Sequence, residues 1–285
     1  MRVSTLRLPG GGTAAGYHDR DDIVVLPHTD VVDLLSSGDD WPTRAMEHDG
    51  ERIPAATVEL ATLVPRPDKI VCLGLNYATH IAEMGRPTPQ HPTLFAKYSG
   101  SLIGARDPIH RPTVSTELDW EAELGVVIGR AGRNVSPDNA LDHVAGYTVI
   151  NDITVRDWQH RTREFLSGKT FESTTPVGPV LVTPDELPEG GGGLDIGCSV
   201  DGTTMQQSNT GDLLFDVAHI VAYLSTIITL TPGDLIATGT PGGVGAGRDP
   251  KVFLTPGQQL TTWVEGVGQL SNTIIQDTFA QETPR

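Results

Sequence analysis

The pattern of hydrophobic positions changes along the chain, and over its larger part it is typical of strands. From Lys69 onward, short runs rich in Val, Ile and Leu are separated by Gly, Pro, Asn and Asp, as in strands joined by tight turns. The dipeptides Asp201-Gly202 and Glu265-Gly266 have the composition of hairpin turns. The predicted strands span residues 124–128, 144–150, 177–182, 194–201, 234–238, 258–264 and 268–274.

Helical periodicity is strong in only one place. Apolar residues recur at helical spacing over residues 212–226, where Asn209 or Thr210 has the side chain of an N-cap. A shorter helix is expected over residues 76–84, after a β-branched run and Gly74. The pattern therefore predicts a β-rich α+β protein with few short helices.

The first part of the chain has the pattern of a separate small unit. Its predicted elements are strands over residues 2–6 and 23–26 and a helix over residues 31–36. Pro65 and Pro67 then exclude helix and favour an extended linker. We expect a small N-terminal domain over residues 1–65 and a larger domain over residues 66–285.

Composition and charge restrict the partners and the location of the protein. A net charge of −16 with a pI near 4.8 argues against a nucleic-acid or an anionic-membrane partner. Cys72 and Cys198 form no Cys-x-x-Cys pair, which excludes a thiolate zinc site and makes a reducing compartment the default. No apolar signal segment is visible, and the longest apolar stretch, residues 219–230, is too short and too polar to span a bilayer. We expect a cytoplasmic protein.

Three carboxylates are the most informative feature of the chain. Glu121 and Glu123 stand two apart at the start of a predicted buried strand, so their side chains point to the same face. Like charges this close need positive compensation, and Asp152, after the next apolar run, would be a third ligand for a divalent cation that prefers oxygen atoms. The alternative is a solvated strand edge, the usual setting of a Glu-x-Glu pair.

Other polar residues have both a structural and a chemical interpretation. His80 and Glu83 lie three apart on the predicted helix, where a carboxylate can orient an imidazole that acts as a general base, although exposed helices produce this spacing by chance. Lys169 follows a glycine, but the Walker pattern of phosphate-binding loops is incomplete, so an isolated surface lysine is the alternative. Arg156 would suit a substrate carboxylate or, equally, a salt bridge to a nearby Asp.

Taken in order along the chain, these motifs resemble those of the fumarylacetoacetate hydrolase family from about residue 65 to the end. They lie at residues 69–80, 119–124, 151–159, 168–169, 176–179, 206–210 and 238–245. The resemblance implies a mixed β-roll or sandwich catalytic domain preceded by a small N-terminal domain, and a homodimer. Residues 170–175 and the Tyr98-Ser99 dipeptide depart from common family sequences and leave the substrate open.

The resemblance also implies the residues of a site. Glu121, Glu123 and Asp152 would hold Mg²⁺ or Mn²⁺. A His80–Glu83 dyad would lie on a lid over residues 76–92 that is mobile without ligand. The residues that would lie beside or line the substrate pocket are Lys169, Tyr77, Arg156, Gln159 and Thr240.

The activity implied by the resemblance is metal-dependent hydrolysis of a C–C bond in a 2,4-dioxo acid of the acylpyruvate or fumarylpyruvate type. The cation would act as a Lewis acid and His80 would activate water. Decarboxylation of oxaloacetate would form the same enolate by loss of CO₂ without an attacking water, and isomerisation or hydration in an aromatic-degradation pathway is a further alternative. The alternative of another class is a non-catalytic, metal-stabilised binding protein, against which His80, Glu83 and Lys169 together argue.

Overall fold

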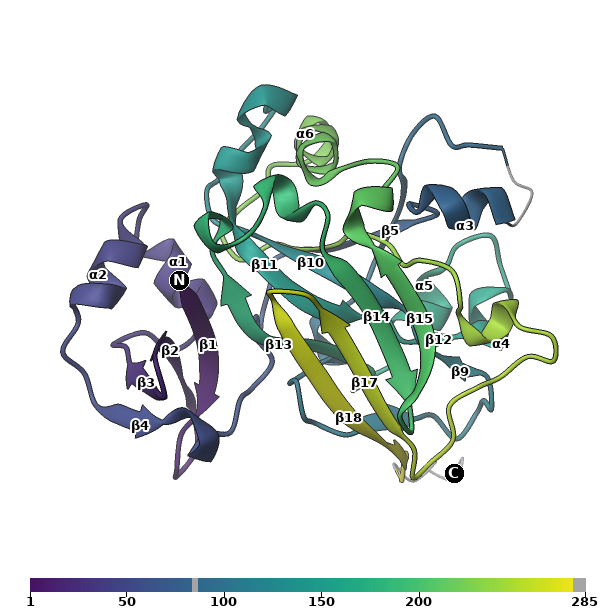
Figure 1. Ribbon diagram of the computed structural model, residues 1–285, viewed down its shortest axis with the longest axis horizontal. Coiled ribbons are helices and arrows are strands. Elements are labelled where there is room, and N and C mark those ends of the chain that lie inside the picture. Colours follow the sequence, from purple (N-terminus) through teal and green to yellow (C-terminus); the bar gives the residue numbers. More distant parts are fainter. Residues whose placement is uncertain (84–86, 279–285) are drawn as a thin grey trace, which may run out of the picture.

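Two β-sheets packed face to face form the body of the molecule (Figure 1). The computed structural model describes residues 1–83 and 87–278. The large sheet has the order β4-β3-β2-β1-β13-β11-β10-β16-β5-β6, with β7 also paired to β13. Its strands are β1 (Arg2–Arg7), β2 (Thr13–Asp19), β3 (Asp22–Val25), β4 (Arg52–Pro54), β5 (Ile70–Gly74), β6 (Thr93–Ala96), β7 (Leu102–Ile103), β10 (Ala122–Ile128), β11 (Val144–Asn151), β13 (Thr175–Val182) and β16 (Leu235–Ala237).

The second sheet has the order β15-β14-β17-β18-β8 and covers one face of the first. Its strands are β8 (Ile109–Arg111), β14 (Asp195–Val200), β15 (Thr203–Asn209), β17 (Gln259–Val264) and β18 (Gly268–Gln276), while β9 (Leu118–Asp119) and β12 (Thr154–Val155) form a separate pair. The α-helices are few and short: α1 (Val31–Ser36), α2 (Trp41–Glu47), α3 (Ala78–Glu83), α4 (Arg156–Gln159), α5 (Leu166–Lys169) and α6 (Val217–Ile227). The prediction of a β-rich α+β fold is confirmed, and the sheets are open rather than closed into a barrel.

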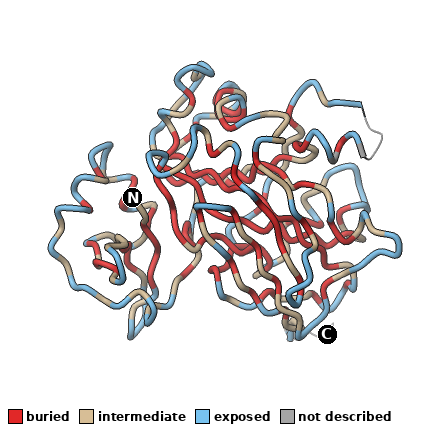
Figure 2. Tube along the Cα trace, viewed as in Figure 1, coloured by how far each residue is buried: buried red, intermediate tan, exposed pale blue. Residues whose placement is uncertain are grey.

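Strands β10 and β11 lie at the centre, and every residue in both is buried (Figure 2). Because successive side chains of a strand point to opposite faces, β10 contributes to two cores. Leu124, Val126 and Ile128 pack in the core that the second sheet shares, whereas Val127 packs in the core on the other side. Burial on both faces explains why residues 124–128 and 144–147 are apolar or glycine throughout and do not alternate with polar residues.

The N-terminal segment extends the large sheet. Strand β1 pairs antiparallel with β13, with Val3 opposite Leu181. Val3, Val31 and Leu34 belong to the same hydrophobic cluster as Cys72 and Leu181 of the larger part. The small unit expected from the sequence therefore shares both a sheet and a core with the rest of the chain.

Most predicted elements are present, with one clear correction. The strands over 144–150, 258–264 and 268–274 correspond to β11, β17 and β18, and both predicted hairpin turns join neighbouring strands. The helix predicted over 212–226 is wrong at its start, because α6 begins at Val217. Among the described residues, no helix has the length and hydrophobicity needed to cross a lipid bilayer.

Long-range hydrogen bonds explain the late start of α6. The backbone N–H of Leu214 donates to the carbonyl of Asn76 at 2.9 Å, and that of Phe215 donates to Asn76 Oδ1 at 2.8 Å. The segment before the helix is thus held extended, and Asp216 becomes the N-cap by accepting from the His219 N–H. Asn209, one of the two predicted caps, instead caps the short 3₁₀ helix Thr210–Asp212, where its side chain accepts the Gly211 N–H.

Candidate active site

The three predicted carboxylates come together at one end of β10 and β11. The antiparallel register places Ala122 opposite Asn151, and the Asp152 N–H donates to the Glu121 carbonyl at 2.9 Å, which brings Asp152 beside the glutamates. One oxygen atom from each of the three carboxylates lies within 4.8 Å of the others, and all three residues are buried. A solvated strand edge, the alternative interpretation, is therefore wrong.

Three buried cations compensate these charges. Lys169 Nζ lies 2.6 Å from Glu121 Oε2 and 2.7 Å from Asp152 Oδ2. Lys97 Nζ lies 2.6 Å from Asp152 Oδ1, and Arg156 Nη2 lies 2.8 Å from Glu121 Oε1. Burial by itself lowers the pKa of Lys169, but Asp152 and Glu121 outweigh it and the pKa is raised, so the ammonium stays charged at neutral pH.

Glu123 is the carboxylate that the protein leaves incompletely paired. Its Oε2 accepts the Gly239 N–H at 2.8 Å, but its Oε1 is buried and has no hydrogen-bond partner in the described part of the chain. Burial, with the neighbouring Asp152 and Glu121, raises the pKa of this carboxyl well above its usual range. A buried, unpartnered oxygen beside two further carboxylates fits an oxygen-preferring divalent cation, which would supply the missing charge. These three residues are suited to hold Mg²⁺ or Mn²⁺.

Asp119 connects the carboxylates to a glycine-rich loop, residues 239–248. Its Oδ1 accepts the Gly245 N–H at 2.7 Å, and its Oδ2 accepts the Ala246 N–H at 3.0 Å and the Arg156 Nε–H at 2.7 Å. Arg156 also donates from Nη1 to Gln159 Oε1 at 2.9 Å. Of the two interpretations of Arg156, the structure places it in salt bridges, and these carboxylates raise its pKa despite its burial.

A cavity of about 550 Å³ opens beside these side chains. Its lining includes Glu121, Lys169, Arg156, Gln159 and Thr240, together with Arg248 on the glycine-rich loop. Thr240 Oγ1 donates to the Ala122 carbonyl at 3.0 Å and accepts from Gln206 Nε2 at 2.8 Å, so its orientation is fixed. This cavity is where a small anionic molecule would meet the carboxylate cluster.

Tyr77, expected among the pocket residues, is fully buried and does not line this cavity. Its hydroxyl group has no hydrogen-bond partner among the described residues, and burial raises its pKa. The side chains of His80 and Glu83 lie outside the described part of the structure, as do residues 84–86. Helix α3 carries both positions, but the dyad and the mobile lid stay predictions.

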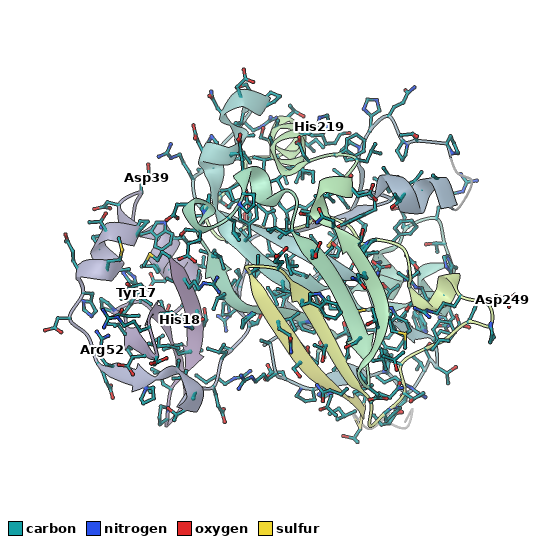
Figure 3. All side chains as sticks on the ribbon, in the orientation of Figure 1. Tyr17, His18, Asp39, Arg52, His219 and Asp249 are labelled. Carbon is teal, nitrogen blue, oxygen red and sulfur yellow. The ribbon has the colours of Figure 1, made fainter. Side chains whose placement is uncertain are left out.

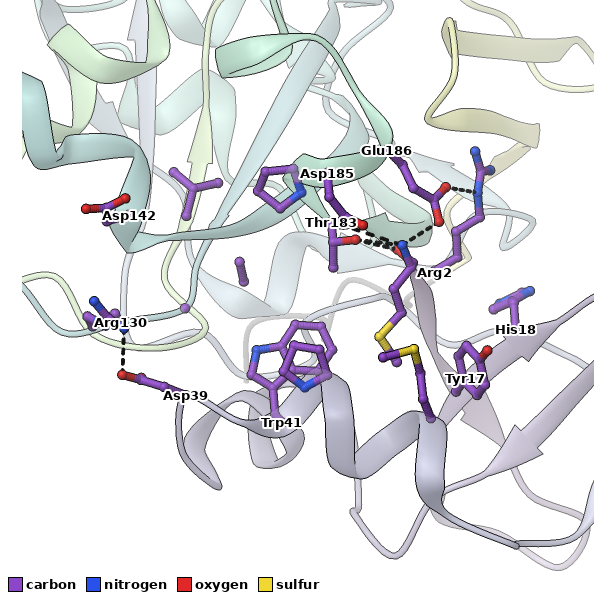
Figure 4. Close-up of a pocket in the computed structure, with 17 residues that line it drawn as sticks. Arg2, Tyr17, His18, Asp39, Trp41, Arg130, Asp142, Thr183, Asp185 and Glu186 are labelled. Carbon is purple, nitrogen blue, oxygen red and sulfur yellow. Dashed lines mark hydrogen bonds and ion pairs between the residues drawn. The ribbon is translucent and has the colours of Figure 1, made fainter.

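A larger cavity of about 630 Å³ lies elsewhere, between the N-terminal segment and the larger part (Figure 4). Trp41 and His18 line it from one side, and Arg130 lines it from the other, where it pairs with Asp39 at 2.7 Å. The carboxylate cluster is not part of its lining. Size alone therefore does not identify the site, and the smaller cavity has the buried, charged groups that chemistry requires.

The sequence assigned no role to Lys97 or to Asn151, although Asn151 lies in one of the family motifs and both residues shape the site. Lys97 is only 4% exposed and holds Asp152, while Asn151 Oδ1 accepts the Glu121 N–H at 2.9 Å. Asn151 Nδ2 also donates to Thr262 Oγ1 at 2.8 Å, which ties the site to the second sheet. The need for positive charge around three buried carboxylates was the available signal, but it does not say which lysine supplies it.

Comparisons with known proteins identify the family. A sequence profile described as fumarylacetoacetate (FAA) hydrolase C-terminal matches residues 69–275. A mitochondrial oxaloacetate tautomerase from Bos taurus is 40% identical over 255 residues, which cover 88% of this chain and 81% of the relative. Fumarylacetoacetate hydrolase from the psychrophile Exiguobacterium antarcticum has a similar structure, with a TM-score of 0.84, 33% identity, and coverage of 97% of this chain and 100% of that one.

A third similar protein has been crystallised with ligands. Maleylpyruvate hydrolase from Sphingobium sp. SYK-6, in complex with manganese(II) and pyruvate, superimposes with a TM-score of 0.79 at 29% identity. The match covers 98% of this chain and 100% of that one. With the profile match over the larger part of the sequence, these likenesses show that the chain belongs to the fumarylacetoacetate hydrolase family.

Proposed function

We propose that this protein is a divalent-metal-dependent enzyme that interconverts the keto and enol forms of a 2-oxo acid, with oxaloacetate as the first substrate to test. The single observation that carries the proposal is the Lys169 ammonium, buried between Glu121 and Asp152 of the candidate metal site. The 40% identity to an oxaloacetate tautomerase supports this choice of substrate.

The charges of the site favour an anionic substrate. Four buried carboxylates, those of Asp119, Glu121, Glu123 and Asp152, face three cations. A divalent ion would therefore leave this buried cluster with one net positive charge, which attracts a carboxylate in a weakly screened setting.

Each group of the site has a part in this reaction. A bound divalent cation would act as a Lewis acid that withdraws electrons from the 2-oxo group. The Lys169 ammonium would donate a hydrogen bond toward the 2-oxo oxygen atom, which becomes negative when the C3 proton passes to a water molecule in the cavity. Water then returns a proton to that oxygen atom, so the keto and enol forms interconvert without a net change in protons. Arg156, fixed by Asp119 and Gln159, keeps Glu121 in position.

Hydrolysis of a 2,4-dioxo acid is the second candidate, and the His80-x-x-Glu83 spacing on α3 favours it. The likeness to maleylpyruvate hydrolase also supports it. In that reaction the imidazole would activate water, a step that tautomerisation does not need. Decarboxylation of oxaloacetate would likewise need no water, and its release of pyruvate distinguishes it from tautomerisation.

The test uses the purified protein with oxaloacetate and acetylpyruvate, in excess chelator and then with Mg²⁺ or Mn²⁺. We expect metal-dependent loss of the enol form of oxaloacetate, and a loss of this activity in Glu123→Ala. His80→Ala should lower acetylpyruvate cleavage by about 10²–10⁴-fold and affect tautomerisation much less. Full activity in chelator would exclude the metal, and equal losses on both substrates would exclude a water-activating role for His80.

A further inference from the structure

Arg248 differs from the other cations that line the cavity. Lys169 and Arg156 are both committed to carboxylates of the protein. Arg248 lines the same cavity from the glycine-rich loop, but in the described part of the chain no Asp or Glu forms an ion pair with it. The neighbouring Asp249 is exposed and is labelled at the outer end of this loop in Figure 3.

The protein holds the Arg248 guanidinium by backbone carbonyl groups. Nη2 donates to the Met205 carbonyl at 2.7 Å and to the Gly243 carbonyl at 3.2 Å, and Nε donates to the Gly243 carbonyl at 3.4 Å. Nη1 makes no hydrogen bond with any residue of the described ranges. The guanidinium is thus oriented on one side and retains donors for a further acceptor.

The position of Arg248 is fixed relative to the metal-binding residues. Its guanidinium lies 5.8 Å from the centre of the Trp120 ring, and Trp120 directly precedes Glu121. The loop that carries Arg248 is anchored because the N–H groups of Gly245 and Ala246 donate to Asp119. A substrate whose 2-oxo acid end meets the carboxylate cluster would therefore have Arg248 on the wall of the same cavity.

We propose that Arg248 is the specificity-determining residue that binds a second, distal carboxylate of the substrate, so that the site selects dicarboxylic 2-oxo acids. This inference rests on the proposed function, since it assigns the two ends of the substrate in that site. An arginine that has unused donors and no acidic partner among the described residues is suited to a carboxylate, which it can bind through two parallel hydrogen bonds.

The test compares oxaloacetate with its 4-methyl ester, which lacks only the distal charge. We expect the Arg248→Gln variant to lose about 10- to 100-fold in kcat/KM for oxaloacetate, mainly through KM, as is usual when a charge-assisted hydrogen bond is removed. Turnover of the ester should change less than about 3-fold, so the variant loses the preference for the diacid. Arg133→Gln is the matched control, because Arg133 likewise binds a backbone carbonyl, that of Ser225, away from the cavity.

Equal losses on both substrates would overturn the inference and assign Arg248 a purely structural role in the loop. A wild-type protein that turns over neither substrate would refute the proposed function separately. Calorimetry with Mn²⁺ and 3,3-difluoro-oxaloacetate, which cannot enolise, then decides the inference. A binding loss of at least about 10-fold in Arg248→Gln, with oxalate affinity unchanged, supports it, and equal affinities for the difluoro compound overturn it.

Discussion

At the level of single residues, the carboxylate cluster depends on two buried lysines, Lys97 and Lys169. Lysine is rarely buried in proteins unless it is paired with an acidic group. Both oxygen atoms of Asp152 are held by lysines, Oδ1 by Lys97 and Oδ2 by Lys169. These ion pairs outweigh burial and lower the pKa of this carboxyl, so Asp152 is ionised and ready to bind a cation. Removing one partner of such a buried pair leaves the other charge uncompensated, which costs far more than an exposed pair is worth.

Lys97→Met should therefore destabilise the protein most strongly when no metal is present. We expect the free energy of unfolding to fall by about 3–5 kcal/mol in excess chelator, the cost of breaking a buried ion pair. Saturating Mn²⁺ should restore part of this loss, because the cation supplies positive charge at the same carboxylate. Urea unfolding with and without Mn²⁺ measures both effects.

The exposed Lys251 provides the control, and Lys251→Met should change the free energy of unfolding by less than about 0.5 kcal/mol. An unfolding midpoint for Lys97→Met equal to that of the wild type in chelator would show that the ion pair with Asp152 contributes nothing to the fold.

At the level of elements, one asparagine connects the start of α3 to two other segments. Asn76 is fully buried, and its Nδ2 donates to the carbonyls of Phe215 at 3.0 Å and Thr238 at 2.8 Å. Its Oδ1 accepts the Phe215 N–H. Thr79 is bound as well, since its N–H donates to Asp212 Oδ2 at 3.1 Å. The beginning of α3 is therefore firmly attached, and motion of the expected lid would have to start beyond it.

Asn76→Ala should release this attachment. We expect a loss of about 1–3 kcal/mol in the free energy of unfolding, because the buried Thr238 carbonyl and the half-buried Phe215 N–H lose their partners. Amide hydrogen exchange over residues 76–83 should become faster, while Asn139→Ala, at an exposed position, should leave it unchanged. Unaltered exchange over residues 76–83 would show that α3 is held by its packing rather than by Asn76.

These contacts also explain which features the sequence could predict. The strands follow from local apolar runs, and the shared face of Glu121 and Glu123 follows from the two-residue repeat of side-chain direction in a strand. Asp152 joins them because consecutive strands commonly pair. The start of α6 and the role of Lys97 do not, because each depends on a partner far along the chain. A helical pattern before Val217 competes with hydrogen bonds to Asn76, and an isolated lysine has no local sign of burial.

At the level of the whole molecule, a hydrogen-bonded chain of side chains joins the N-terminal segment to the large sheet. Ser4 Oγ donates to the Pro179 carbonyl at 3.0 Å, and His18 Nε2 lies 2.7 Å from the same Oγ. Since the single hydroxyl proton of Ser4 is used toward Pro179, His18 is assigned as the donor to Ser4. Burial, with a smaller effect of Arg2, lowers the pKa of His18 to about 4.

This shift predicts a pH dependence of stability. The unfolded chain takes up a proton at its ordinary pKa near 6.5, whereas the folded protein does so only near 4, so the contribution of His18 is complete above 6.5 and is lost as the pH falls toward 4. We expect the free energy of unfolding to fall by about 2 kcal/mol over this range. This is less than the full pKa shift would give, because the ring is partly exposed and solvent screens the effect. His18→Gln keeps a donor without the titration, and urea unfolding from pH 7 to 4 should show a smaller decline for it.

The pairing of β1 with β13 has a consequence for how the protein is made. Translation proceeds from the N-terminus, so β1 leaves the ribosome long before β13, the strand that covers its free edge. Without β13, the sheet formed by β4, β3, β2 and β1 would leave the edge of β1 unpaired, and an unpaired strand edge can pair with another chain. A truncated product that ends before β13 would therefore expose the edge of β1 and would be prone to aggregate.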